Sequence, residues 1–135
     1  MRTHIEFRSD KFPAYPGEQE KINPDLWGQR LAEYLQIKLN EEGISTDEHI
    51  GFEDWGCELA LVGTPFPIRI GCGRYQEYPN GYLCFITPSQ PVIRKFLFKK
   101  IDTTSEVIRI ADALDKILTS DPDIRDLRWW SKNER

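Results

Sequence analysis

Histidine is the scarcest acid–base candidate in this sequence, which contains only His4 and His49. An imidazole among carboxylates can act as a general acid–base group or hold a divalent ion. A small hydrolase using His49 and Asp54 is therefore one hypothesis. The spacing around His49 matches no known site, so we favour a solvated acidic loop and expect no metal or other cofactor. The carboxylates in question are Asp47, Glu48, Glu53 and Asp54.

The other histidine, His4, lies in a segment where it is out of phase with Ile5 and Phe7. That alternation is typical of a half-buried strand. We expect the His4 side chain to be exposed to solvent.

Three cysteines could supply a nucleophile or a soft metal ligand, namely Cys57, Cys72 and Cys84. Their odd number and wide spacing fit neither a C-x-x-C motif nor a complete disulfide framework. Each lies in an apolar, strand-like segment, where a free cysteine behaves as a small hydrophobic residue. The spacing favours three buried structural thiols, with a reactive or metal-binding thiol as the alternative.

Gly71-Cys72-Gly73 resembles the beginning of a dinucleotide-binding fingerprint, but no third glycine and no helical pattern follow it. The glycines instead predict a strand that another backbone or side chain approaches closely. Arg74 and the tyrosines after it then form an aromatic hairpin, which is either part of a recognition surface or ordinary packing at the end of a sheet. The tyrosines are Tyr75, Tyr78 and Tyr82.

Trp129 and Trp130 are adjacent in an expected strand, so their side chains point to opposite faces. One can fill the core. The other either joins an exposed binding patch or is covered by neighbouring chain or a second subunit.

Charge is unevenly distributed along the chain, whose net charge is −4. Residues 41–60 contain seven acids and no Lys or Arg, whereas residues 61–100 contain six bases and one acid. If these segments form neighbouring strands, we expect opposite charges to pair across the sheet. The acidic balance argues against nucleic acid as a partner, because that affinity depends on neutralising phosphates.

Two helices are predicted to hold these residues in place. The first spans Pro24–Glu42, with Asn23 as its N-cap and Gly43 as its C-terminal stop. The second follows a capping box formed by Thr103 and Glu106 and ends at Asp121-Pro122. Its apolar stripe consists of Val107, Ile110, Ala111, Leu114, Ile117 and Leu118.

Alternating apolar residues predict the strands, with a loop at 11–21 and a tight Asn-Gly turn at 80–81. Trp55, Cys57, Leu59 and Leu61 are expected on one side of their strand. The element order β-α-β-β-β-β-α-β predicts an α+β two-layer sandwich, with a mainly antiparallel sheet of five to six strands and both helices on one face. The expected strands are Thr3–Ser9, Trp55–Val62, Ile68–Cys72, Tyr82–Thr87, Val92–Ile101 and Ile124–Trp130.

The 135 residues, 39% of them hydrophobic, are typical of a single domain spanning 1–135. No run of 18 apolar residues could cross a membrane, and the first residues lack the apolar stretch of a signal peptide. We therefore expect a soluble cytoplasmic protein with no membrane partner.

Five segments together resemble a group of small uncharacterised bacterial proteins, over most of the chain. They are Glu53-Asp54-Trp55-Gly56-Cys57, Ile70-Gly71-Cys72-Gly73, Cys84-Phe85-Ile86, Lys100-Ile101-Asp102 and Arg128-Trp129-Trp130. The resemblance implies an α+β fold and brings no activity, cofactor or catalytic residue. In size, acidity and plan the chain is also similar to immunity proteins that neutralise bacterial toxins, a likeness of architecture alone.

These observations favour a non-enzymatic module of immunity or inhibitor type that binds a partner protein. The uncovered sheet face, the aromatic hairpin and the acidic segment would form its surface. A small-ligand-binding or homo-oligomeric structural module, such as a homodimer, is the alternative. The candidate binding residues are Glu53, Asp54, Glu58, Arg69, Arg74, Tyr75, Tyr78 and Trp130.

Overall fold

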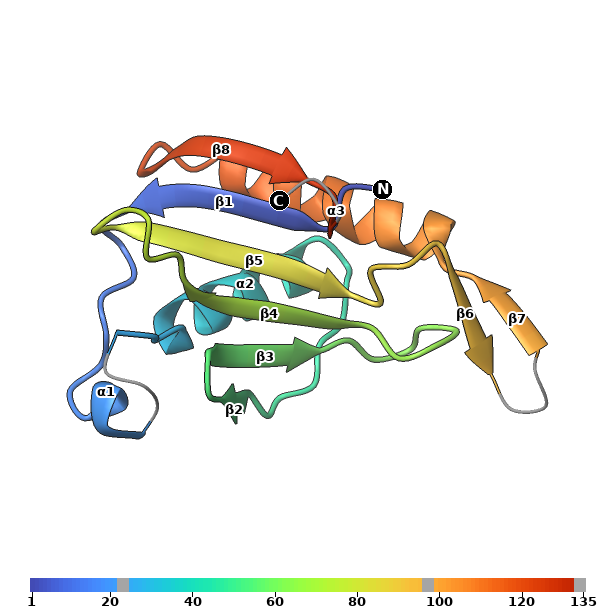
Figure 1. Cartoon of the computed structure of the whole chain (residues 1–135), viewed down its shortest axis with the longest axis horizontal. Coiled ribbons are helices and arrows are strands. Elements are labelled where there is room, and N and C mark those ends of the chain that lie inside the picture. The colour runs from blue at the N-terminus through green and yellow to red at the C-terminus, as the bar shows by residue number, and fades with distance from the viewer. Residues whose placement is uncertain (22–24, 96–98, 133–135) are drawn as a thin grey trace.

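The computed structural model of the chain describes residues 1–21, 25–95 and 99–132 and shows an α+β fold, as predicted. Three helices accompany a six-stranded sheet and a separate two-stranded sheet (Figure 1). The helices are α1 (Glu18–Lys21), α2 (Gln29–Glu41) and α3 (Thr104–Thr119). The strands are β1 (His4–Ser9), β2 (Gly51–Glu53), β3 (Gly56–Ala60), β4 (Arg69–Arg74), β5 (Gly81–Thr87), β6 (Val92–Lys95), β7 (Lys99–Asp102) and β8 (Ile124–Trp130). Within the described residues, no helix is long and apolar enough to cross a membrane.

The large sheet is antiparallel throughout, in the order β2-β3-β4-β5-β1-β8. The N-terminal strand β1 lies between β5 and β8, so its backbone is hydrogen-bonded on both sides. This pairing brings the first and last strands of the chain side by side. The central position of β5, between β4 and β1, agrees with its apolar residues on both faces.

Helices α2 and α3 cover one face of this sheet, as predicted (Figure 1). α2 packs against β3 and β4, and α3 packs against β5 and β8. The six apolar residues of the predicted stripe of α3 are all buried. The sheet contributes the alternate residues that face the helices, including Ile5, Phe7, Leu59, Ile70 and Ile86.

The prediction of a single strand over Val92–Ile101 is wrong. This segment forms the two strands of a hairpin, with Val92 opposite Asp102 and Ile93 opposite Ile101. Ile93 and Ile101 pack partly against the core, which anchors the base of the hairpin. Residues 96–98, where the alternation predicts Phe96 and Phe98 on one side of the strand, lie outside the described residues.

Helix α2 begins later than the sequence predicts, at Gln29 and not at Pro24. Asn23 and Pro24 lie outside the described residues. The N-cap is Gly28, which has no side chain to accept a hydrogen bond from the first turn. The carboxylate of Glu18, in the segment predicted to be a loop, accepts from the backbone N–H groups of Gly28 (3.0 Å) and Gln29 (2.9 Å). A buried carboxylate from another element therefore caps this helix.

The expected caps and turns elsewhere also differ. Thr103 donates its hydroxyl to the carbonyl oxygen of Gln90, so the predicted capping box does not form. Asp102 Oδ1 instead accepts from the backbone N–H of Thr104 at 2.9 Å. The predicted Asn-Gly turn is replaced by a longer loop, because Gly81 already belongs to β5 and Asn80 bonds with its side chain to Arg8.

Replacing Glu18 by alanine should destabilise the protein by about 2–3 kcal/mol, because a hydrogen bond to a charged group typically contributes about 1.5–3 kcal/mol. Besides the two N–H groups of α2, Glu18 accepts from the backbone N–H of Tyr15 at 3.0 Å. Urea unfolding followed by circular dichroism measures the change. Glu20→Ala, at an exposed position in the same short helix, is the matched control and should differ from wild type by less than about 0.5 kcal/mol. Equal effects of the two substitutions would contradict the capping role.

Gly28 also lies where no side chain fits. A β-carbon at this position would overlap the carbonyl oxygen of Cys72 and lie 3.3 Å from the backbone nitrogen of Cys57. The start of α2 therefore rests directly on the backbones of β3 and β4.

Gly28→Ala should consequently destabilise the fold by about 2–3 kcal/mol or more, through overpacking against rigid backbone. Gly51→Ala is the matched control, since a β-carbon there meets its nearest atom, the Glu58 carbonyl oxygen, at an ordinary 3.7 Å. The midpoints of urea unfolding of the two variants test this difference. A Gly28→Ala protein as stable as Gly51→Ala would show that α2 is free to move away from the sheet.

Candidate functional site

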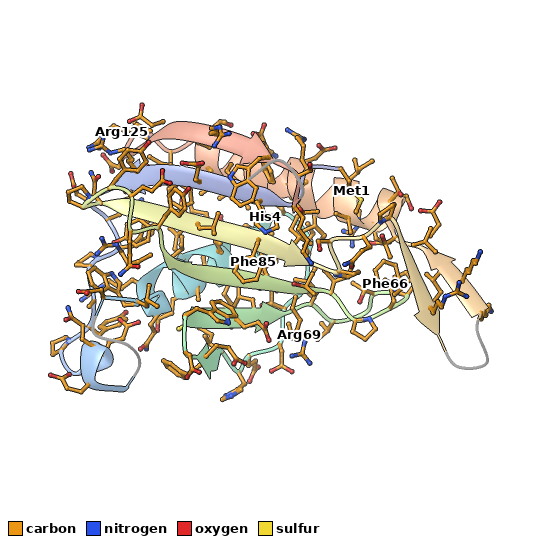
Figure 2. The ribbon with its side chains drawn as sticks, in the orientation of Figure 1. Met1, His4, Phe66, Arg69, Phe85 and Arg125 are labelled. Atoms are coloured by element: carbon orange, nitrogen blue, oxygen red, sulfur yellow. The ribbon has the colours of Figure 1, made fainter. Side chains whose placement is uncertain are left out.

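The sheet face opposite α2 and α3, called the bare face below, is the main candidate surface. In the part of the chain that the structure describes, no helix packs over it (Figure 1). Direct cross-strand neighbours lead across it from β3 to β8, and Figure 2 shows two of them, His4 and Phe85, on this face. The neighbours are Glu58, Gly71, Phe85, His4 and Trp130, in that order.

Four rings form an aromatic row across the middle of the bare face: Trp55, Phe85, His4 and Trp130. The ring centroids lie 4.9 Å apart between Trp55 and Phe85, 5.7 Å between Phe85 and His4, and 4.3 Å between His4 and Trp130. Trp55, Phe85 and His4 are half-buried, whereas Trp130 is only 7% exposed. The row therefore presents apolar surface in the place where a solvated sheet is usually polar.

The aromatic row depends on the glycines of β4. The ring of Phe85 lies over Gly71, where a β-carbon would overlap it. A β-carbon at Gly73 would lie 2.5 Å from the carbonyl oxygen of Trp55. The close approach predicted for these glycines is therefore observed.

The prediction for Trp55 itself was wrong, because it was expected to face the same way as Cys57. Trp55 lies in the turn before β3, and the next residue, Gly56, has a φ of 151°. This glycine conformation ends the alternation and allows the indole to lie beside Phe85.

The two terminal tryptophans point to opposite faces, as predicted. Trp129 faces the helices, donates to Asp115 of α3 at 2.8 Å and lies beneath the guanidinium of Arg2. Trp130 faces the other way and is covered, so it contributes little exposed surface.

His4 is half-buried, which corrects the expectation that it is exposed. Its ring stacks between neighbours of the aromatic row, and Nδ1 lies 2.8 Å from the hydroxyl oxygen of the buried Thr3. Burial, and to a lesser extent the positive charge of Lys132, lower the pKa of His4 below its ordinary value of 6.5. The imidazole is therefore neutral near pH 7.

This lowered pKa predicts a pH dependence of stability. Below pH 6.5 the unfolded chain takes up a proton at His4 that the folded chain resists, so stability is present above this pH and is lost as the pH falls through the folded pKa. His4→Phe keeps an aromatic ring and removes the titration. Between about pH 7.5 and about pH 5.5, the free energy of unfolding should fall more steeply for wild type than for His4→Phe. Parallel profiles in urea titrations would contradict a desolvated imidazole.

Ion pairs border the aromatic row. Glu58 and Arg69 pair across β3 and β4 at 2.9 Å, and Glu6 and Arg128 pair across β1 and β8 at 2.8 Å. The first pair joins the acidic and basic segments, which confirms the predicted cross-strand pairing at this point. Glu6 is 5% exposed, and its partner on the rim is exposed.

A hollow of about 380 Å³ lies at one end of the bare face. It falls within the common size range of small-ligand sites, roughly 300–1,000 Å³. The residues around it mix rings with hydroxyl, amide and ammonium groups: His4, Phe85, Ile86, Thr87, Ser89, Gln90 and Lys132.

The predicted aromatic hairpin lies at the other end and is only partly directed outward. Tyr78 is 37% exposed, with the guanidinium of Arg8 over its ring at 5.0 Å and Tyr75 at 6.4 Å. Arg74 is turned to the helix side, with its guanidinium over Trp27 at 4.4 Å. Tyr82 is buried and donates its hydroxyl to the carbonyl oxygen of Phe12 at 2.6 Å. The structure thus separates Arg74 and Tyr82 from the candidate surface.

The acid–base candidates lie apart from the aromatic row. His49, Glu53 and Asp54 are exposed, and the backbone N–H of His49 donates to Asp47 Oδ1 at 2.8 Å. Neither His49 nor Asp54 lines the hollow described above. Across the described residues, no three His, Cys, Asp or Glu side chains are grouped so as to hold a metal ion.

The three cysteines lie opposite one another on β3, β4 and β5, on the face under the helices. All three are free and fully buried, which confirms the predicted burial. Burial raises the pKa of Cys57 to about 12, and a hydrogen bond with Cys84 together with burial raises that of Cys72 well above its usual range. Cys57 and Cys72 are therefore protonated thiols in a core, the opposite of what nucleophilic catalysis requires.

The residues that sequence reasoning missed are Phe85 and Leu83, the half-buried outward residues of β5. The sequence contains a signal for them, because both faces of β5 carry apolar residues. That pattern predicts a central strand, which β5 is, but does not show that its outward side is left uncovered.

The geometry defines a two-layer α+β protein with a bare, partly aromatic sheet face. No family model, curated protein or solved structure gives a significant match to this chain.

Proposed function

We propose that this chain is a non-enzymatic binding protein of immunity or inhibitor type, which engages a partner protein through its bare face. The observation that carries the proposal is the aromatic row on a sheet face that no described helix covers. Aromatic residues are enriched in protein interfaces, because they bury a large area with few rotatable bonds.

The surroundings of the aromatic row support this proposal. The Glu58–Arg69 and Glu6–Arg128 pairs supply polar groups at its borders, as in interfaces with an apolar centre and a polar rim. Phe85, His4 and Trp130 lie on hydrogen-bonded strands, and Trp55 lies in the short turn before β3, so little side-chain or backbone order has to be gained on binding.

The acidic residues contribute through long-range attraction in this proposal. Exposed carboxylates at Glu53 and Asp54 lie at the edge of the same sheet and would steer a basic partner, such as a nuclease toxin, toward it. The likeness to immunity proteins in size, acidity and α+β plan agrees with such a partner and rests on architecture alone.

The hollow beside His4 supports a second candidate function, the binding of a small molecule. Its volume of about 380 Å³ and its mixture of rings, hydroxyls and an ammonium group fit a small polar ligand. The hydrolase alternative is weaker, because His49 and Asp54 are both exposed and the hollow lies elsewhere.

Leu83→Lys should weaken partner binding, because it places a charge beside the aromatic row. Affinity capture from the native cell with the tagged chain identifies the partner, and calorimetry with the purified partner measures the affinity. We expect a loss of at least about tenfold, or about 1.4 kcal/mol. Thr87→Lys, at an exposed position of the same face, should act in the same direction and carries less risk to folding.

Ile37→Lys is the matched control, since Ile37 is 61% exposed on α2, on the opposite side of the protein. It should bind the partner as wild type does. Equal affinity of all four proteins, or failure to capture any partner, would contradict binding through the bare face. A small molecule that stabilises wild type but not Thr87→Lys in a thermal-shift screen would instead favour the second candidate.

A further inference from the structure

The β6–β7 hairpin, called the basic hairpin below, concentrates positive charge on a projecting element. Figure 1 shows it extending beyond the end of β5, away from the six-stranded sheet. Arg94 lies opposite Lys100, and Lys95 lies opposite Lys99. Like charges directly opposite each other destabilise an antiparallel pair, and an isolated two-stranded hairpin is only marginally stable. This arrangement costs free energy unless an anionic surface offsets it.

The rest of the described chain does not supply that surface. Arg94, Lys99 and Lys100 are exposed, and no ion pair joins them to any described residue. Among the described residues of the two strands, the acid is Asp102, whose Oδ1 accepts a hydrogen bond from the backbone N–H of Thr104. β6 and β7 pair only with each other among the described strands, so each also has an open edge.

The complementary surface is the acidic edge, which we define as residues 48–54. Glu48, Glu53 and Asp54 are exposed there, and residues 41–60 contain no Lys or Arg. β2 ends the six-stranded sheet, so only one of its edges pairs with a described strand. Phe52 is 47% exposed within this acidic edge, and Val92 is 48% exposed on the basic hairpin.

We propose that the basic hairpin docks against the acidic edge of a second copy of this chain. Three features match: opposite charge, an exposed apolar side chain on each surface, and an open strand edge on each surface for backbone hydrogen bonds. The two surfaces are different patches, so the contact is head-to-tail and leads to rings or to open chains.

A second copy fits these observations better than nucleic acid does. The whole chain carries a net charge of −4, which repels a phosphate backbone at long range. Two copies also carry like net charge, but the local opposite charges meet within about one Debye length, roughly 10 Å in 0.1 M salt. The association should therefore be weak and orientation-dependent.

Sedimentation velocity of the full chain tests the proposal. We expect the weight-average mass to rise with protein concentration in low salt and to fall toward that of the monomer in high salt. Reversing the hairpin charges with Lys99→Glu and Lys100→Glu should weaken association at least tenfold. Reversing the acidic edge with Glu48→Lys and Glu53→Lys should do the same.

An equimolar mixture of the two reversed proteins should restore association to within a few-fold of wild type, because each surface then meets its opposite. Arg109→Glu with Arg125→Glu is the matched control. It gives the same net charge as the hairpin reversal, at exposed positions outside both surfaces, and should associate as wild type does. Circular dichroism establishes that every variant is folded.

Three results would overturn the proposal. They are a wild-type chain that stays monomeric at all concentrations and salt levels, charge reversals that leave association unchanged, and a mixture that stays monomeric. A monomeric wild type that binds a DNA duplex, with the binding lost on reversal of Lys99 and Lys100, would assign the basic hairpin to nucleic acid instead.

Discussion

The backbone of β4 around Cys72 is approached more closely than any side chain would permit, and much of the structure follows from that constraint. Gly28 at the start of α2 and Gly56 before β3 both meet the carbonyl of Cys72 where a β-carbon would overlap it. Because neither backbone can retreat without losing its sheet or helix contacts, these glycines fix where α2 crosses the sheet and how the β2–β3 turn folds. The Glu18 carboxylate then satisfies the helix end that this close packing leaves without a side-chain cap.

The same close packing around β4 also shapes the bare face, on the side of the sheet away from the helices. Gly56 turns Trp55 toward the bare face, and Gly71 leaves room for the ring of Phe85. His4 extends the aromatic row because β1 is held in register between β5 and β8. The residues that build the fold are thus also those that create its candidate binding surface, and the cysteines beneath are part of the buried core.

Acidic and basic residues are distributed differently in the six-stranded sheet and in the two-stranded sheet. Where acidic and basic segments are neighbours, as at Glu58 and Arg69, opposite charges pair and stabilise a solvated surface. The bases of β6 and β7 lie on a separate hairpin, and among the described residues no ion pair joins Arg94, Lys99 or Lys100 to an acid. Glu53 of β2 and Asp54 directly after it lie at the edge of the large sheet. The charge segregation of the sequence therefore produces two separate surfaces of opposite sign in the fold, the basic hairpin and the acidic edge.

The sequence by itself determined the α+β class, the buried stripe of α3, the inward residues of the strands and the opposite directions of Trp129 and Trp130. These features follow from periods of 2 and 3.6 residues, which are local properties of the chain. Tertiary structure alone decided the start of α2, the reversal within residues 92–102, the packing of Arg74 on Trp27 and the outward turn of Trp55. Three of these depend on a residue from another element: Glu18 for the helix cap, Trp27 beneath Arg74, and Cys72 against Gly56. The fourth, the hairpin, depends on the pairing of β6 with β7. Periodicity shows which residues share a face, but only packing decides which faces meet.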